Sequence, residues 1–235
     1  MTPRTLPVPR RHGGGLGPVT ALADLLAPPR CLACRQRGVT PWCHGCREAV
    51  RVLAAGCPRC AAPRGAAHAC WPPDAPIEGV TAAYDYNGVV AAAIATAKLS
   101  GAHAAWPALA APLLSRLSAA PPPADAVTWV TTPPARVRQR GADHAQRLAH
   151  LVAAHLGLPA LPLLRARSAR GGRDRYAAVH TLPGTDLLLV DDILTTGATA
   201  WRAGGILRAA GGGRLHLAVL ARAGTHPLGA AARGG

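Results

Sequence analysis

The chain contains no phenylalanine and only one methionine, and five Trp and three Tyr are its whole aromatic content. A core built on large aromatic rings is therefore excluded, and the 49% of hydrophobic residues must fill it mainly with Ala, Leu and Val. Long apolar runs are also missing, since no stretch approaches the roughly 18 residues that a membrane-spanning helix needs. The segment after Arg11 is broken by Pro and Asp and has no cleavage site. We therefore expect a cytoplasmic protein that is neither inserted in a membrane nor secreted.

Acidic residues are scarce as well. The chain has 11 Asp and Glu against 26 basic residues, which gives a formal net charge of +15, and Lys98 is its single lysine. Such an excess favours phosphates or nucleic acid as partners. It is also what a GC-rich genome produces, because the same bias that enriches Ala, Gly and Pro can replace Lys by Arg without changing function. Charge alone leaves both interpretations open.

The phosphate loop of ATP- and GTP-binding proteins, Gly-x-x-x-x-Gly-Lys-Ser/Thr, is absent too. The chain has instead Leu-Leu-Leu-Val-Asp-Asp-Ile-Leu-Thr-Thr-Gly-Ala-Thr at residues 187–199. The apolar run 187–190 predicts a strand covered on both faces, as in a parallel sheet. Asp191 and Asp192 follow at its carboxyl end, which is the edge where ligands bind in α/β sheets.

A turn of small and hydroxyl-bearing residues comes next and leads into a helical pattern over 200–210. Its members are Thr195, Thr196, Gly197, Ala198 and Thr199. Backbone N–H groups, the positive end of the helix dipole and three hydroxyls favour a bound phosphate here. Two carboxylates beside that phosphate need hydroxyls or Mg²⁺ to bind, so a sugar phosphate fits better than a nucleoside triphosphate. The alternative, a strand ending in an Asp that caps the helix, explains neither the second Asp nor the Thr-Thr-Gly.

Seven cysteines gather in the amino-terminal third, as three Cys-x-x-Cys pairs and one further residue. They are Cys31, Cys34, Cys43, Cys46, Cys57, Cys60 and Cys70. Zinc is favoured over redox chemistry, which needs one pair, and over disulfides, which need an oxidising compartment. The first two pairs make the simplest four-sulfur site. The other three cysteines lack a fourth ligand, for which His68 is the candidate, with a degenerate or empty second site as the open alternative. We expect one or two structural zinc ions.

Strand and helix patterns alternate from residue 77 onward. We expect strands at 80–86, 127–130, 161–164, 187–190 and 215–220. We expect helices at 89–99, 106–117 and 200–210, and one more helix that ends near Gly157. Arg136, Arg138 and Arg140 follow the strand at 127–130, where they either bind phosphate oxygens or form a solvated basic loop. The arginine run 165–175 lacks a hydrophobic period and is expected to be a mobile loop.

These patterns divide the chain into four expected parts. They are a basic, mobile leader at 1–27 with a short helix at 19–26, a zinc-binding module at 28–74, an α/β domain at 75–225 and a tail at 226–235.

The segment Val-Asp-Asp-Ile-Leu-Thr-Thr-Gly-Ala-Thr resembles the phosphoribosyl pyrophosphate (PRPP) motif of type I phosphoribosyltransferases. Together with the cysteine module, Lys98 and Arg138-x-Arg140-Gly141, it makes residues 28–222 similar to the ComF family. Proteins of that family are phosphoribosyltransferase-like and associated with natural competence. The resemblance implies an α/β fold, with a type I phosphoribosyltransferase-like parallel sheet flanked by helices and preceded by a small zinc-ribbon-like module.

The same resemblance implies roles for the site residues. Asp191 and Asp192 contact ribose hydroxyls and help to hold Mg²⁺, while the turn Thr195 to Thr199 cradles the 5′-phosphate. Lys98 matches a lysine position of the family, and Arg138 and Arg140 lie near the pyrophosphate. The run 165–175 corresponds to the flexible loop over the site.

The chain also departs from the family pattern. Val-Thr-Thr-Pro at 130–133 replaces the usual Val-Pro-Val-Pro, the loop up to Tyr176 is short, and one zinc-ligand cysteine is missing. Three hypotheses follow: a PRPP- and Mg²⁺-dependent phosphoribosyltransferase, a non-catalytic PRPP sensor or single-stranded-DNA-binding accessory of DNA uptake, and a structural partner of a competence helicase. The sequence identifies neither an acceptor substrate nor an oligomeric state.

Overall fold

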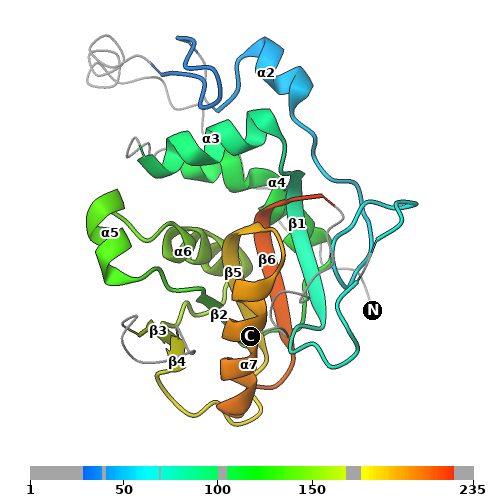
Figure 1. Ribbon diagram of the computed structural model, residues 1–235, viewed down its shortest axis with the longest axis vertical. Helices are drawn as coiled ribbons and strands as arrows, with labels where there is room; N and C mark the ends of the chain where they lie inside the picture. Colours follow the sequence, from blue (N-terminus) through cyan, green and yellow to red (C-terminus); the bar gives the residue numbers. More distant parts are fainter. Residues whose placement is uncertain (1–28, 39–40, 69, 100–104, 168–175, 225–235) are drawn as a thin grey trace, which may run out of the picture.

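The computed structural model describes residues 29–38, 41–68, 70–99, 105–167 and 176–224 (Figure 1). The expected leader with its helix at 19–26, most of the arginine run 165–175 and the tail lie outside these described residues. Within them, no helix is both long and apolar enough to cross a membrane.

Four parallel strands form the central sheet, and helices connect them. In chain order the elements are α2 (His44–Ala49), β1 (Gly79–Asp85), α3 (Gly88–Leu99), α4 (Trp106–Ala119), β2 (Ala126–Trp129), α5 (Pro134–Arg140), α6 (His144–Leu156), β3 (Leu164–Ala166), β4 (Tyr176–Ala178), β5 (Leu187–Leu194), α7 (Ala198–Ala209) and β6 (Leu215–Arg222). The sheet order is β1-β6-β5-β2, and β3 and β4 pair separately as an antiparallel ribbon. The expected fold class, a parallel sheet flanked by helices with cysteine groups before it, is confirmed.

Each face of the sheet is covered by a different set of helices. Strand β5 alternates between them, because Leu188 and Val190 belong to the core formed with α3, α4 and α6, whereas Leu187 and Leu189 face α7. All four side chains are at most 1% exposed. A strand buried on both faces needs an unbroken apolar run, and burying each such side chain contributes about 1.5–3 kcal/mol.

Strand β5 is longer than expected. It continues past Val190 to Leu194, so that Asp191 and Asp192 lie within the strand rather than beyond it. Pairing with β6 explains the extension, since Ile193 lies opposite Ala221 and keeps the backbone in the ladder.

The basic segment after β2 is also different from the expected loop, because residues 134–140 form helix α5. Pro134 stands at the first helical position and Gly141 follows the last with a φ of 76°, which are the usual start and stop residues of a helix. The strand expected at 161–164 begins only at Leu164 and pairs with β4, so the arginine run starts inside a strand.

Helix α7 contains Gly204, whose cost in a helix has no explanation from the sequence alone. A Cβ at this position would lie 2.9 Å from Leu215 Cδ2 and 3.2 Å from Pro76 Cγ. Glycine is therefore required for the close approach of α7 to the sheet. Gly205 has open space around it, and nothing in the structure explains it.

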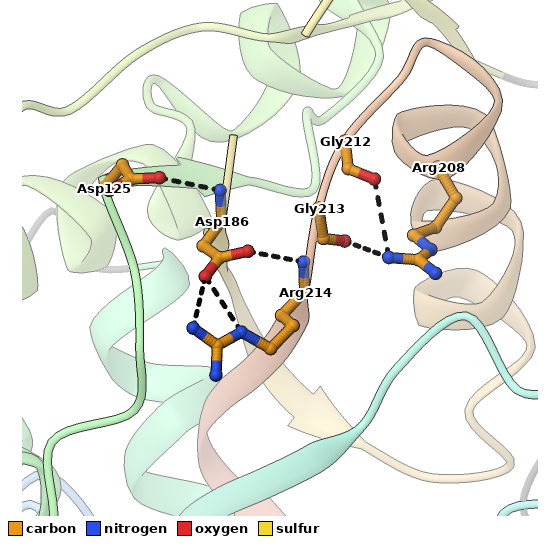
Figure 2. Close-up of polar contacts among 6 residues, drawn as sticks. All are labelled: Asp125, Asp186, Arg208, Gly212, Gly213 and Arg214. Carbon is orange, nitrogen blue, oxygen red and sulfur yellow. Dashed lines mark hydrogen bonds and ion pairs between the residues drawn. The ribbon is translucent and has the colours of Figure 1, made fainter. Parts of the chain in front are cut away.

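The amino ends of three strands are tied together at the edge opposite to the aspartates (Figure 2). Asp186 Oδ1 accepts from Arg214 N at 2.7 Å, and its Oδ2 accepts from the Arg214 guanidinium at 2.8 and 2.9 Å. Asp125 Oδ2 in turn accepts from the Asp186 backbone N–H at 2.8 Å. The Arg214 guanidinium holds the pKa of Asp186 below its ordinary value of 3.8. These contacts join the amino ends of β2, β5 and β6, so the charged residues at this edge of the sheet hold the strands together.

Candidate functional site

Asp191 and Asp192 point to opposite sides of the sheet, as neighbours in a strand must. Asp192 lies on the side of α3, where its Oδ2 forms an ion pair with Lys98 Nζ. The two side chains are 21% and 15% exposed, so the pair is largely shielded from water. Asp191 lies on the side of α7. Lys98, selected from the sequence only as a family position, therefore belongs to the same site as the aspartates.

The turn after β5 and Asp191 line one hollow, whose volume is about 270 Å³ when the space open to solvent is included. Its walls include Asp191, Thr195, Thr196, Gly197, Ala198 and Thr199. Helix α7 begins at Ala198, and Gly197 precedes it with a φ of 74°, a conformation that suits glycine. Residues 198–200, the first turn of α7, line the hollow, so an anion bound there would lie beside N–H groups that lack a partner within the helix.

The two adjacent carboxylates make this edge electrostatically unusual. Burial, followed by repulsion from Asp192, raises the pKa of Asp191 well above its ordinary value of 3.8. The Asp192 backbone N–H donates to Asp191 Oδ1 at 2.8 Å and opposes that rise. A cation or a set of ligand hydroxyls would favour the ionised form of Asp191 and so oppose the rise of its pKa.

The structure places the predicted arginines on α5, beyond the carboxyl end of β2. Arg138 is exposed there, whereas the side chains of Arg136 and Arg140 lie outside the described structure. Asp143, which sequence reasoning did not select, anchors this segment: it accepts from the N–H and hydroxyl of Thr132 at 2.9 and 3.1 Å, and from Gln146 N at the start of α6. An Asp just before an apolar helical pattern is the signal that could have identified this cap.

The first cysteine group comes together as expected. The sulfurs of Cys31, Cys34, Cys43 and Cys46 all lie within 4.8 Å of one another. Cys34 and Cys43 are 3.6 Å apart, close to the roughly 3.8 Å that tetrahedral zinc with bonds of about 2.3 Å imposes on its sulfurs. Burial opposes ionisation of Cys31, but N–H groups of Cys34 and Cys43 lower the pKa of its thiol from 9.0 to about 6.

The second group also reaches four ligands, with His68 as the fourth. The ligand atoms of Cys57, Cys60, His68 and Cys70 lie within 4.8 Å of one another. His68 Nδ1 is 2.9 Å from the Ala66 carbonyl, which can only accept, so Nδ1 carries the proton and Nε2 keeps the lone pair that a metal needs. Both groups therefore fit zinc in number and kind of ligand, and neither offers the open position that catalysis requires.

The second group is in contact with the sheet, which sequence analysis did not anticipate. Trp71, next to Cys70, is 3% exposed and packs against the turn, where a Cβ at Gly197 would lie 3.0 Å from its Cζ3. It also packs against Trp201 of α7, with ring centroids 5.9 Å apart. On β6, Arg222 Nε donates to the Cys60 carbonyl at 2.6 Å. No local signal predicts these contacts, because the partners are distant in the sequence.

No protein-family model matches the chain, and no curated protein matches it. Among solved structures, the allosteric regulatory enzyme of purine biosynthesis is similar over 50% of this chain and 25% of its own, with 23% identity and a TM-score of 0.39. Adenine phosphoribosyltransferase from Leishmania tarentolae is similar over 51% of this chain and 71% of its own, with 14% identity and a TM-score of 0.32. The chain spans a quarter of the first structure's length. Its own topology assigns it to the α/β proteins with a parallel sheet flanked by helices, preceded by two groups that could hold zinc.

Proposed function

We propose that the chain is a ComF-like, type I phosphoribosyltransferase-like protein of the cytoplasm that binds PRPP with Mg²⁺ at the carboxyl edge of β5. The observation that carries the proposal is the hollow that Asp191 shares with the turn 195–199 at the start of α7. A phosphate binder and a hydroxyl or cation binder thus lie side by side, and a sugar phosphate presents both chemistries. A role in DNA uptake rests on the resemblance to ComF alone.

Each part of the site has a proposed task. The N–H groups and hydroxyls of Thr195 to Thr199 hold the 5′-phosphate, and Asp191 and Asp192 accept from the ribose hydroxyls and help to hold Mg²⁺. Lys98 limits the repulsion between the aspartates by neutralising Asp192. Arg138 and Arg140 donate to the pyrophosphate, whose charge needs several forked donors.

If the protein is an enzyme, the bond from C1′ to the pyrophosphate oxygen breaks while an acceptor nucleophile forms a new bond to C1′. The pyrophosphate carries away the electron pair of the broken bond. Arginines placed around that group lower the barrier by stabilising the charge that develops on it.

A second candidate is a PRPP sensor or single-stranded-DNA-binding accessory that uses the same site without turnover. The net charge of +15 and the short arginine-rich sequence before Tyr176 favour it. A competence helicase is a further candidate partner, through the cysteine groups. In either case we propose that the two groups hold structural zinc.

Calorimetric titration of PRPP into zinc-loaded protein, with and without Mg²⁺, tests the proposal. We expect Mg²⁺-dependent binding that is lost in Asp191→Asn/Asp192→Asn. Glu78→Gln is the matched control, because Glu78 is an exposed carboxylate just before the amino end of β1. Absence of PRPP binding by the wild type would reject both the enzyme and the sensor. Binding followed by pyrophosphate release with some acceptor would identify the enzyme, and binding without release in an acceptor screen would favour the sensor.

A further inference from the structure

Arg222, the last residue of β6, is a buried cation without a carboxylate partner among the described residues. It is 2% exposed, and its Nε donates to the Cys60 carbonyl at 2.6 Å. Its Nη1 and Nη2 are buried and have no hydrogen-bond partner within the described chain. Asp85 lies opposite in register on β1, yet no ion pair joins the two residues. An uncompensated charge in such a place is strongly unfavourable, so something must balance it.

The second cysteine group is the candidate source of negative charge next to Arg222, because thiolates that bind zinc are deprotonated. Cys60 belongs to that group, and its backbone carbonyl accepts from Arg222 Nε. The side chain of His68, in the same group, lies within electrostatic range of Arg222. A ligand phosphate is a poor alternative, because a residue that is 2% exposed cannot meet a ligand from solution without rearrangement of β6.

The two cysteine groups would differ in net charge once zinc is bound, and the residues around them differ as well. A zinc ion with three thiolates and one neutral imidazole carries a net charge of −1, whereas a zinc ion with four thiolates carries −2. Cys60 of the second group is fully buried, so water cannot solvate its charge. In the first group Cys34 is exposed, and two exposed arginines, Arg35 and Arg37, lie within three residues of it. Each group thus has one fully buried cysteine, Cys31 or Cys60, but among the described residues only the second group has a buried arginine in contact with it.

We infer that Arg222 is the charge-balancing residue of the second metal centre, and that this centre binds Zn²⁺ through Cys57, Cys60, His68 and Cys70 as a unit of net charge −1. The inference rests on the proposed zinc sites and is independent of PRPP. Arg222 also lies opposite Leu194 of β5, and Ala223 N donates to the Leu194 carbonyl at 2.8 Å. Metal at this centre thereby stabilises the end of β6 beside the strand that carries the aspartates.

Zinc content and affinity of the full-length protein, measured by competition with a chromophoric chelator, test the inference. We expect two zinc ions per chain in the wild type. Arg222→Met, which removes the charge and keeps similar bulk, should weaken the second ion at least tenfold and leave the first unchanged. Arg222→Lys should restore most of that affinity, since it keeps the charge. Arg214→Met is the matched control, because it removes an arginine from the opposite edge and should leave both ions bound.

Cobalt in place of zinc gives a second readout that does not depend on stability. In a Cys31→Ser background, where the first site lacks a ligand, the visible bands of Co²⁺ report three thiolates at the remaining site. Arg222→Met should bind this Co²⁺ more weakly without changing the band positions. Equal zinc affinity of wild type and Arg222→Met would overturn the inference, as would Arg222→Lys binding no better than Arg222→Met. A wild type that holds fewer than two zinc ions would reject the second centre itself, whatever its PRPP binding.

Discussion

Lys98 of α3 forms an ion pair with Asp192 of β5, so the single lysine of the chain neutralises one of its two adjacent aspartates. Asp191 lies on the other side of the strand, where burial and repulsion from Asp192 raise its pKa although the charge of Lys98 opposes the rise. The two carboxylates thus stand in different electrostatic environments. Asp192 is held in the ion pair with Lys98, while Asp191 binds its proton more tightly than an ordinary aspartate.

Removal of Lys98 should destabilise the protein through Asp192. Lys98→Met leaves a largely shielded carboxylate unpaired beside Asp191, and we expect the free energy of unfolding to fall by about 1–3 kcal/mol. Lys98→Met/Asp192→Asn should recover most of that loss, because the unpaired charge is gone. Urea denaturation of the single and double variants measures both. Additive losses in the double variant would show that the ion pair has no energetic role.

Asp191→Asn should stabilise the ligand-free protein at neutral pH. A raised pKa means that the folded state holds a proton more tightly than the unfolded state, so the wild type loses stability as pH rises from 3.8 through the raised value. Below 3.8 both states are protonated, and the difference between wild type and variant should become small. Thermal unfolding of both proteins from pH 3.5 to 8 measures this difference in stability. A variant that is less stable than the wild type at pH 7.5 would contradict this expectation.

Gly197→Ala should cost more stability than Gly141→Ala. Both glycines have a left-handed backbone, with φ of 74° and 76°, so the conformational penalty of about 1 kcal/mol is shared. Only at position 197 does the new methyl group also clash with a side chain. The alanine Cβ would overlap the indole of Trp71 there, whereas a Cβ at position 141 would have nothing within 4 Å. We expect an excess loss of about 1–3 kcal/mol at Gly197, relieved in part by Trp71→Leu. Equal losses at the two glycines would mean that the indole moves away freely.

The sequence predicted those features whose structure depends only on residues within one short segment. The apolar run of β5 requires burial on both faces, and the turn after it requires small residues before a helix, so both could be placed from the sequence. The cysteine pairs were grouped correctly because each loop brings two ligands together by itself. Helix α5 was expected as a loop because its start and stop residues, Pro134 and Gly141, also occur in turns.

Residue types and local spacing determined the chemistry that this chain offers: paired carboxylates before a turn of small and hydroxyl-bearing residues, and two groups of four ligands that could hold zinc. The sheet order β1-β6-β5-β2 decided which of these residues come into contact, because it places the first strand beside the last. That order brings Arg222 to Cys60, although the two are 162 positions apart, and packs Trp71 against Gly197. Hydrophobic periodicity indicates which face of a strand is buried, but the neighbour of that strand is chosen by the packing of the whole chain. Only the tertiary structure could therefore join the second cysteine group to the candidate ligand site.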